Sequence, residues 1–448
     1  MVLNVLIIFL GVKDLPKKAQ DLVTKAVISV FLLDLVWNLS AAFYVLYIIE
    51  TVGIEQLGIL IATSFLVQAA LDYPSGVLGD WIGQKFILFI GFSLEALAFG
   101  TLVFANSFPS LMIVYILRAI AFSQQSGAIG TWLDNNYKLA TNEEDPDRKI
   151  YKFFVGRWAT IANVTPGIAI AIGGLLATIY YRKAVFSVQV IGLSLIAFLF
   201  LLIIKDLPEI ERPKRSLKNY FALLGEGLQF VLFNRTVLLF MIGLCISETV
   251  IIIWAQMMLF PVYYGYTGSD VGIGFLRFVI LLIGTPLTFF AAKVAARCDL
   301  KWIPWLRFSD TAGFFWGIAL LTAWIPINNN SFNPTAIVLI LLIYSSVWFF
   351  HNVGVILRQR LFLDLIPDRN RNSIYSLIPT ILLIASTPGI IIGASMIQNY
   401  GVPTTSFFLG AFGAISILFF HLSMRTIQIN TAGDTIEFLE KEGDYIHN

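Results

Sequence analysis

The sequence contains few charged residues, few cysteines and few histidines. Only 13% of its 448 residues are Asp, Glu, Lys or Arg, and it holds two cysteines and three histidines. A soluble domain has roughly 25% charged residues, so this composition excludes an ordinary soluble protein. His351, His421 and His447 give no pair at metal-ligand spacing, and we expect neither a metal nor a cofactor. Cys245 and Cys298 are expected at different depths and therefore as free thiols.

Motifs of ATP-driven pumps and of hydrolytic enzymes are also missing. No G-x-x-x-x-G-K-[ST] phosphate loop occurs, so the energy source should be an ion gradient rather than ATP. Neither H-E-x-x-H nor G-x-S-x-G occurs, which leaves a membrane-embedded enzyme as a remote alternative. The net charge of +2 does not indicate nucleic-acid binding. Apolar sequence dominates instead, with 58% hydrophobic residues and a mean hydropathy of +0.80.

Twelve apolar segments are long enough to cross a membrane, for which a helix needs about 20 residues. They lie near residues 27–49, 54–79, 86–106, 109–135, 153–179, 184–204, 237–261, 271–294, 304–325, 335–362, 373–398 and 403–423. We expect an all-α integral membrane protein whose twelve transmembrane helices form two pseudo-symmetric six-helix bundles around a central cavity. The expected parts are an N-terminal cytoplasmic or interfacial segment 1–26, a bundle 27–204, a cytoplasmic linker 205–236 with an amphipathic helix, a bundle 237–423 and a cytoplasmic tail 424–448.

Lys and Arg residues mark one side of the membrane, because short cytoplasmic loops carry an excess of them. If both termini are inside, only Arg182 and Lys183 fall outside, and Arg118 and Arg277 fall within helices. Every other Lys and Arg then lies in or beside an inside segment. We therefore expect a multi-pass protein of the plasma membrane with both termini cytoplasmic.

Two pairs of short matches relate the halves of the chain. Pro146-Asp147-Arg148 precedes the fifth segment, and Thr165-Pro166-Gly167-Ile168 lies within it. Pro367-Asp368-Arg369 and Thr387-Pro388-Gly389-Ile390 stand in the same places relative to the eleventh. A mid-helix proline removes a hydrogen bond, so both helices are expected to bend at these Pro-Gly pairs. Close packing by the glycines is the alternative.

The stretch from Asp72 to Lys85, between the second and third segments, combines glycines with opposite charges at the membrane boundary. Several of its residues match, in register, the G-x-L-A-D-R-x-G-R-K loop of the major facilitator superfamily, namely Gly76, Leu78, Asp80, Gly83 and Lys85. The residues Asp72, Pro74, Ser75 and Gly76 are similar to the E-x-P-T-G extension of a branch with many drug-efflux-like members. The chain thus resembles this superfamily over nearly its whole length.

The resemblance implies a secondary transporter that works by alternating access, with this loop as a conformational latch. It assigns the latch to Asp72, Gly76, Asp80, Gly83, Lys85 and Asp134, with Asp134 as a partner for Lys85. Trp81 and Gln84 replace the arginines of the family loop, so the latch is expected to be weaker than the family norm. The glycine-rich fifth helix of efflux members is matched only by Gly156, Gly173 and Gly174, which favours export over import by a small margin.

Charged residues at bilayer depth cost about 2.5 to 3.5 kcal/mol each, so they should be paired, protonated or hydrated. In the family architecture helices 1, 4, 7 and 10 line the cavity, and helical spacing selects Asn38, Arg118, Gln125, Trp254, Gln256, Trp348, His351 and Asn352 as substrate-cavity candidates. Glu248, without a cation within one helical turn, is the first candidate proton carrier, and Asp34 is the second. An ion pair of either acid with Arg118 is the alternative. Glu95 and Asp310 are expected to be structural, with Arg307 as the local partner of Asp310.

These expectations lead to a monomeric carrier embedded in the lipid bilayer. The favoured function is proton-coupled export of a small amphipathic or drug-like solute. A uniporter or proton symporter for a sugar, organic acid or other metabolite is the alternative. A channel or non-transporting receptor would keep the repeat without needing a titratable acid in the cavity.

Overall fold

The computed structural model describes residues 2–126, 128–141, 144–146, 148–204, 217–327, 332–365, 371–426, 428–429 and 436–437, and nearly all of them are helical. The first half contains α1 (Val2–Leu10), α2 (Lys17–Trp37), α3 (Tyr44–Val52), α4 (Ile54–Ile82), α5 (Gln84–Phe104), α6 (Phe108–Gln125), α7 (Ala128–Ala140), α8 (Lys149–Ile179) and α9 (Arg182–Ile203). Residues 205–216 of the expected linker lie outside the described part, and α10 (Leu217–Phe233) follows them.

The second half begins with α11 (Arg235–Ile253), which continues through the π-helical turn η1 (Trp254–Met258) into α12 (Leu259–Thr267). The remaining helices are α13 (Asp270–Ala295), the 3₁₀ turn η2 (Leu300–Trp302), α14 (Ile303–Phe308), the π-helical turn η3 (Ser309–Gly313), α15 (Phe314–Trp324), α16 (Pro334–Leu365) and α17 (Arg371–Arg425). In the tail, β1 (Gln428–Ile429) pairs antiparallel with β2 (Ile436–Glu437). The rest of the expected tail lies outside the described residues.

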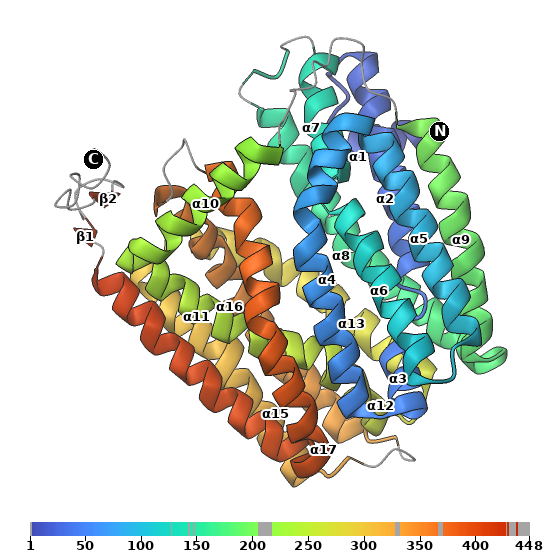
Figure 1. Ribbon diagram of the computed structural model, residues 1–448, viewed down its shortest axis with the longest axis vertical. Coiled ribbons are helices and arrows are strands. Elements are labelled where there is room, and N and C mark those ends of the chain that lie inside the picture. Colours follow the sequence, from blue (N-terminus) through green and yellow to red (C-terminus); the bar gives the residue numbers. More distant parts are fainter. Residues whose placement is uncertain are drawn as a thin grey trace.

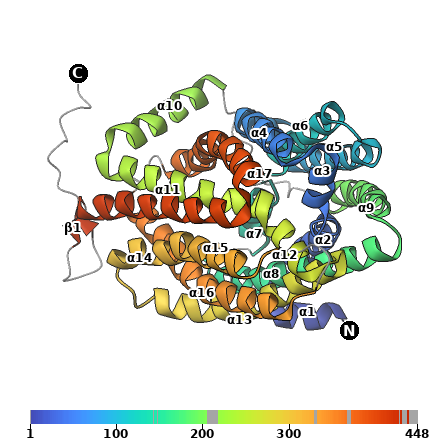
Figure 2. The same ribbon diagram turned by 90° about the horizontal axis from the view of Figure 1, so that it is seen from below.

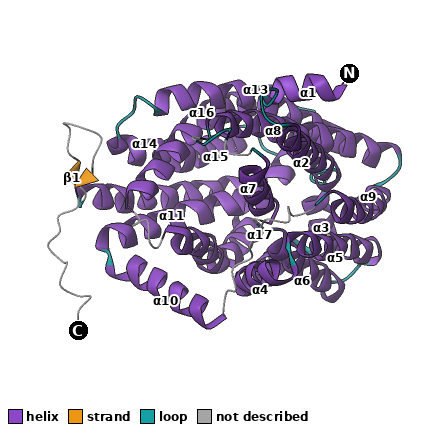
Figure 3. Cartoon of the chain, turned by 90° about the horizontal axis from the view of Figure 1, so that it is seen from above, coloured by secondary structure: helices purple, strands orange, loops and turns teal. Residues whose placement is uncertain are grey.

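The two halves of the chain lie side by side (Figure 1). Helices α2 to α9 are on one side and α11 to α17 are mostly on the other, as the view from below also shows (Figure 2). α4 and α17 approach each other near α3 and α12 and separate toward α7 and α10. We call these two ends of the molecule the α3 end and the α7 end. Figure 3 shows how completely helices make up both halves.

Eight stretches of the described helices are long and apolar enough to span a membrane. One of them, Leu377–Arg425 with 49 residues, is long enough for two crossings. α17 contains two helices, because Gly401 interrupts it with a φ of 73°. The all-helical fold with several potential membrane spans is thus confirmed, whereas the number of twelve crossings stays a prediction.

The Pro-Gly helices of the two halves form long contacts between them, with α8 packed against α13 and α17 against α4. A Cβ atom at Gly167 would lie 3.2 Å from a side chain of α13, and one at Gly389 would lie 2.4 Å from Thr249 of α11. Close packing, the alternative use of these glycines, is therefore confirmed. Both helices continue through Pro166 and Pro388, and bending there stays a prediction.

The first expected span, 27–49, is not one helix, and this expectation is wrong. α2 ends and α3 begins on either side of residues 38–43, which form turns. The side-chain amide of Gln189 donates to the carbonyls of Val36 and Trp37, at 3.0 Å each. These bonds supply hydrogen-bond partners at the end of α2, where the helical pattern is interrupted, as a break at membrane depth requires. We call residues 38–43 the helix break.

A glycine of α8 allows the helix break to pack closely against this helix. A Cβ atom at Gly173 would lie only 1.6 Å from the carbonyl oxygen of Leu39. No side chain fits between backbones that approach so closely, so glycine is required here. The neighbouring Gly174 has the same role against α13, where a Cβ atom would lie 2.4 Å from the carbonyl oxygen of Asp270.

Candidate functional site

A cavity of about 510 Å³ lies between the first half and residues 255, 256, 260 and 383 of the second half. Its aromatic lining comes from Trp37, Tyr44, Phe65, Phe99, Tyr115, Phe122 and Phe260. Its polar lining comes from Asn38, Ser40, Ser64, Gln68, Glu95, Arg118 and Gln256. Small-molecule sites usually enclose about 300 to 1,000 Å³, so this cavity has room for a solute of that size.

An ion pair between α5 and α6 forms the charged part of the lining. Arg118 Nε donates to Glu95 Oε1 at 2.9 Å, and Glu95 is only 2% exposed. The guanidinium carbon of Arg118 lies 4.7 Å from the ring centroid of Tyr44 and 5.2 Å from that of Phe99. The cation is thus held by one carboxylate and two aromatic faces. Asp34 and Glu248, the partners suggested for Arg118 by the sequence, do not pair with it.

Asn38 and Gln256 also reach the cavity, and both lie where a helix is irregular. Asn38 opens the helix break, and its side-chain amide donates to the backbone carbonyl of Asp34 at 2.9 Å. Gln256 belongs to η1, a π-helical turn between α11 and α12. Such turns often mark functional positions, because they redirect the side chains of a helix.

Four other predicted cavity residues do not line this cavity; three of them contact neighbouring helices, and Asn352 bonds to its own helix. Gln125 is buried beside Gly91, Trp254 donates to Tyr344 at 2.6 Å, Trp348 donates to Thr288 at 3.2 Å, and Asn352 donates to the backbone of Trp348 at 2.7 Å. Helical spacing correctly groups residues on one face of a helix. It does not decide which face meets the other half, and here tertiary packing turns these side chains away from the cavity.

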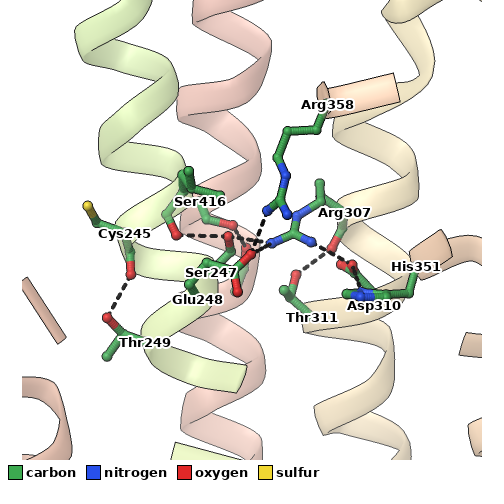
Figure 4. Close-up of polar contacts among 12 residues, drawn as sticks. Cys245, Ser247, Glu248, Thr249, Arg307, Asp310, Thr311, His351, Arg358 and Ser416 are labelled. Carbon is green, nitrogen blue, oxygen red and sulfur yellow. Dashed lines mark hydrogen bonds and ion pairs between the residues drawn. The ribbon is translucent and has the colours of Figure 1, made fainter. Parts of the chain in front are cut away.

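A second group of charged side chains, the charge network, joins three helical segments of the second half (Figure 4). Its members are Ser247, Glu248, Arg307, Asp310, His351 and Arg358. Arg307, 1% exposed, donates to Ser247 at 2.8 Å, to Glu248 at 2.9 Å and to Asp310 at 2.8 Å. The local Arg307–Asp310 pair expected from the sequence is confirmed.

Arg358 and His351 bond to the two carboxylates of the charge network. Arg358 Nη1 donates to the same Glu248 oxygen as Arg307, at 2.7 Å. His351 Nδ1 lies 2.8 Å from the Asp310 oxygen that Arg307 contacts. Apart from the charge of His351, two arginines balance two carboxylates. His351, a predicted cavity residue, is therefore part of this network and not of the cavity lining.

The network overturns the reason for choosing Glu248 as the first proton carrier. The sequence showed no cation near Glu248 on its own helix, but α14 and α16 each bring an arginine to its carboxylate. A carboxylate that two cations contact is held in its charged form. Asp34, by contrast, has no ion pair and no hydrogen bond to its carboxylate within the described part of the chain.

The expected latch is only partly placed by the structure. α4 continues to Ile82, and Gly83, with a φ of 89°, makes the turn into α5. Asp72 lies on α4 and has one buried carboxylate oxygen without a hydrogen-bond partner. The surroundings of Gly76 and the side chain of Asp80 lie outside what the structure describes. Lys85 contacts the ring of Phe86, 5.7 Å from its centroid.

The structure shows a partner for Asp134 other than the predicted Lys85, and their pairing in the closed latch stays a prediction. Arg148, just before α8, donates to Asp134 at 2.5 Å, and Lys85 does not pair with it. Arg148 has a φ of 53°, a left-handed conformation at the start of the helix. The Pro-Asp-Arg sequence before α8 thus supplies the cation for Asp134, which the register of the family loop cannot reveal.

An ion-paired group at the α3 end was missed by the sequence analysis, which used Arg182 only as a topology marker. Arg182 donates to both carboxylate oxygens of Asp270, at 2.8 and 2.9 Å, and to Glu50 at 2.7 Å. Glu50 and Arg182 belong to the first half, whereas Asp270 begins α13 of the second half. We call these three residues the inter-half triad, because they join the halves where α3 and α12 lie.

Comparison with known proteins agrees with this architecture. A sequence profile described as Major Facilitator Superfamily matches residues 26–357. The chain belongs to the Major Facilitator Superfamily. This superfamily member is accordingly a membrane transporter and not an enzyme. No curated protein sequence matches it.

Solved structures share the fold of this transporter at low sequence identity. The nucleoside transporter NupG is 13% identical, with a TM-score of 0.69 over 90% of this chain and 99% of that chain. The D-xylose-proton symporter is 12% identical, with a TM-score of 0.67 over 89% and 96%. The peptide transporter POT in complex with sulfate is 12% identical, with a TM-score of 0.63 over 92% and 94%. At such identities the likeness establishes the fold alone.

Proposed function

We propose that this chain is a secondary active transporter that moves a small solute by alternating access. Its twelve crossings would form two bundles, with both termini in the cytoplasm of a plasma-membrane protein. One observation carries the proposal, namely a solute-sized cavity between two halves that are joined by ion pairs at the α3 end and diverge toward the α7 end. In this proposal the structure corresponds to the state open toward the cytoplasm.

The inter-half triad should hold this state, so we expect Arg182→Gln to shift the carrier toward opening at the α3 end. Coupling energies of about 1 to 3 kcal/mol change a population roughly 5- to 150-fold. The reporter is Ser64→Cys in the cavity, in a background with Cys245→Ala and Cys298→Ala. Labelling by an impermeant maleimide added on the α3 side should rise about fivefold or more.

The neighbouring cation provides the control for this experiment. Lys183 has no ion pair among the described residues, so Lys183→Gln should leave labelling unchanged. Asp270→Asn should act like Arg182→Gln, because it removes the partner in the second half. Unchanged labelling in both triad variants would contradict the proposed closure at the α3 end.

Proton-coupled export of an amphipathic solute is the form of transport that we propose, with Asp34 as the proton carrier. A half-buried carboxylate without a cation can gain and lose a proton as its access to water changes. The alternative of a uniporter or symporter for a metabolite is favoured by the polar lining, in which amides and hydroxyls are as prominent as aromatic rings. Direction and coupling therefore need a transport measurement.

Proteoliposomes with an internal pH dye provide this measurement, with ethidium, uridine and D-xylose added singly. We expect at least one solute to move protons in the wild type and Asp34→Asn to abolish that movement. Asp21→Asn, which changes an exposed acid near the start of the same helix, is the matched control and should retain it. Proton movement that persists in Asp34→Asn would exclude Asp34, and solute uptake without proton movement in the wild type would favour the uniporter.

A further inference from the structure

The charges of the cavity lining cancel within the first half. Arg118 and Glu95 are the charged side chains among the described lining residues, and they bond to each other at 2.9 Å. Glu95 is 2% exposed, so its carboxylate neutralises Arg118 and leaves almost no charged surface of its own for the solute. A charged solute that enters this space meets no uncompensated opposite charge.

The surface that remains for a solute combines ring faces with neutral hydrogen-bonding groups. Tyr44 and Phe99 flank the guanidinium of Arg118, a cavity-lining residue whose side chain is 26% exposed. Asn38, on the helix break, and Gln256, on the π-helical turn, offer amides from the two halves. Aromatic faces favour flat apolar rings, while amides and the guanidinium pair with carbonyl and hydroxyl groups.

We propose that the cavity selects an uncharged solute that joins a flat ring to several hydroxyl, carbonyl or amide groups. Nucleosides and aryl glycosides have this chemistry. The inference rests on the proposed transport function and adds the physical reason for its selectivity. Burying a net charge in a mostly apolar cavity is costly unless an opposite charge compensates it, and here Glu95 already occupies Arg118.

The experiment compares three uridines that differ only in the group at the 5′ position, and thereby in charge. They are uridine, its 5′-carboxylate and its 5′-amino-5′-deoxy analogue, which are neutral, anionic and cationic at pH 7. Dissociation constants are measured by isothermal calorimetry on the purified full-length transporter. We expect uridine to bind the wild type at least about tenfold more tightly than either charged analogue, which is one step of 1.4 kcal/mol.

Removing the neutralising carboxylate should reverse part of this preference. In Glu95→Gln the Arg118 charge is uncompensated, so the 5′-carboxylate should gain about tenfold relative to uridine. The double variant Glu95→Gln with Arg118→Gln removes both charges and should return the preference to the neutral analogue. Glu55→Gln, on the exposed first turn of α4, is the matched control and should leave all three affinities unchanged.

The outcomes separate this proposal from the transport function on which it rests. Tighter wild-type binding of either charged analogue than of uridine overturns the proposed selectivity. An unchanged preference in a folded Glu95→Gln variant overturns the role given to Glu95. Binding of none of the three, with transport of ethidium, overturns the solute class but leaves the carrier intact. Transport of no solute, together with no response of the inter-half triad variants, overturns the carrier itself.

Discussion

Gly173→Ala is expected to destabilise this transporter by about 3 kcal/mol or more, a large effect for one methyl group. The added Cβ would lie 1.6 Å from the carbonyl oxygen of Leu39 and 2.5 Å from its carbonyl carbon. Both are backbone atoms of the helix break, so neither can rotate away as a flexible side chain does. The methyl group must therefore separate α8 from the break, and Gln189 should lose its bonds to Val36 and Trp37. Thermal unfolding in detergent, monitored by tryptophan fluorescence, measures the loss.

Gly156→Ala is the matched control, because Gly156 lies on the same helix and a Cβ there would meet nothing within 4 Å. Replacing a helical glycine in open space with alanine usually stabilises a helix by about 0.5 to 1 kcal/mol. The two identical substitutions should therefore change stability in opposite directions. A Gly173→Ala protein as stable as Gly156→Ala would mean that the break does not approach α8 so closely.

The sequence allowed most of the helices to be predicted, because apolar runs of membrane length depend on the solvent and not on the partner helix. The helix break could not be predicted in this way. Residues 38–43 contain neither proline nor glycine, so no local signal interrupts the expected span. Its causes lie far away in the chain, in Gly173 and Gln189. The sequence analysis singled out Gly173 and Gly174 of α8, but it did not predict which backbone segments pack against them.

In the candidate site, too, features that depend on one helix could be predicted from the sequence, and contacts between helices could not. The sequence selected Arg118, Asn38 and Gln256 correctly, because the family architecture indicated which helices face the cavity. All three residues line it. Glu95 was expected to be structural, yet it reaches the cavity as the partner of Arg118. Long side chains cross between neighbouring helices, and single-helix spacing cannot reveal such pairs.

The charge environment of Glu248 also depends on contacts between helices that the sequence does not reveal. An acid without a cation on its own helix looked free, but cations from two other helices contact it. In the structure the charge network and the cavity have different roles, structural and solute-binding, which the sequence could not distinguish. The network has a buried arginine that bonds three groups, which is typical of a structural junction, whereas the cavity retains exposed donors for a solute.

Arg307→Met is the second substitution with a large expected effect. Arg307 is 1% exposed and bonds to Glu248, Asp310 and Ser247 at once, so its loss leaves the 0% exposed Asp310 carboxylate with only His351 among the described residues. Removing one partner of a buried ion pair typically costs about 3 to 5 kcal/mol, because the remaining charge is uncompensated. We expect loss of most of the folded protein after detergent extraction, measured by size-exclusion chromatography.

Two further variants distinguish a charge effect from a packing effect. Arg307→Met with Asp310→Asn removes the uncompensated charge along with its partner and should recover most of the folded protein, since paired replacement is often close to neutral. Arg358→Met removes the second, 21% exposed cation of Glu248 but leaves Arg307 in place, so it should cost only about 1 kcal/mol. If the double variant were as unstable as Arg307→Met, the arginine would act through its packing volume, and the balance of charges would not explain the junction.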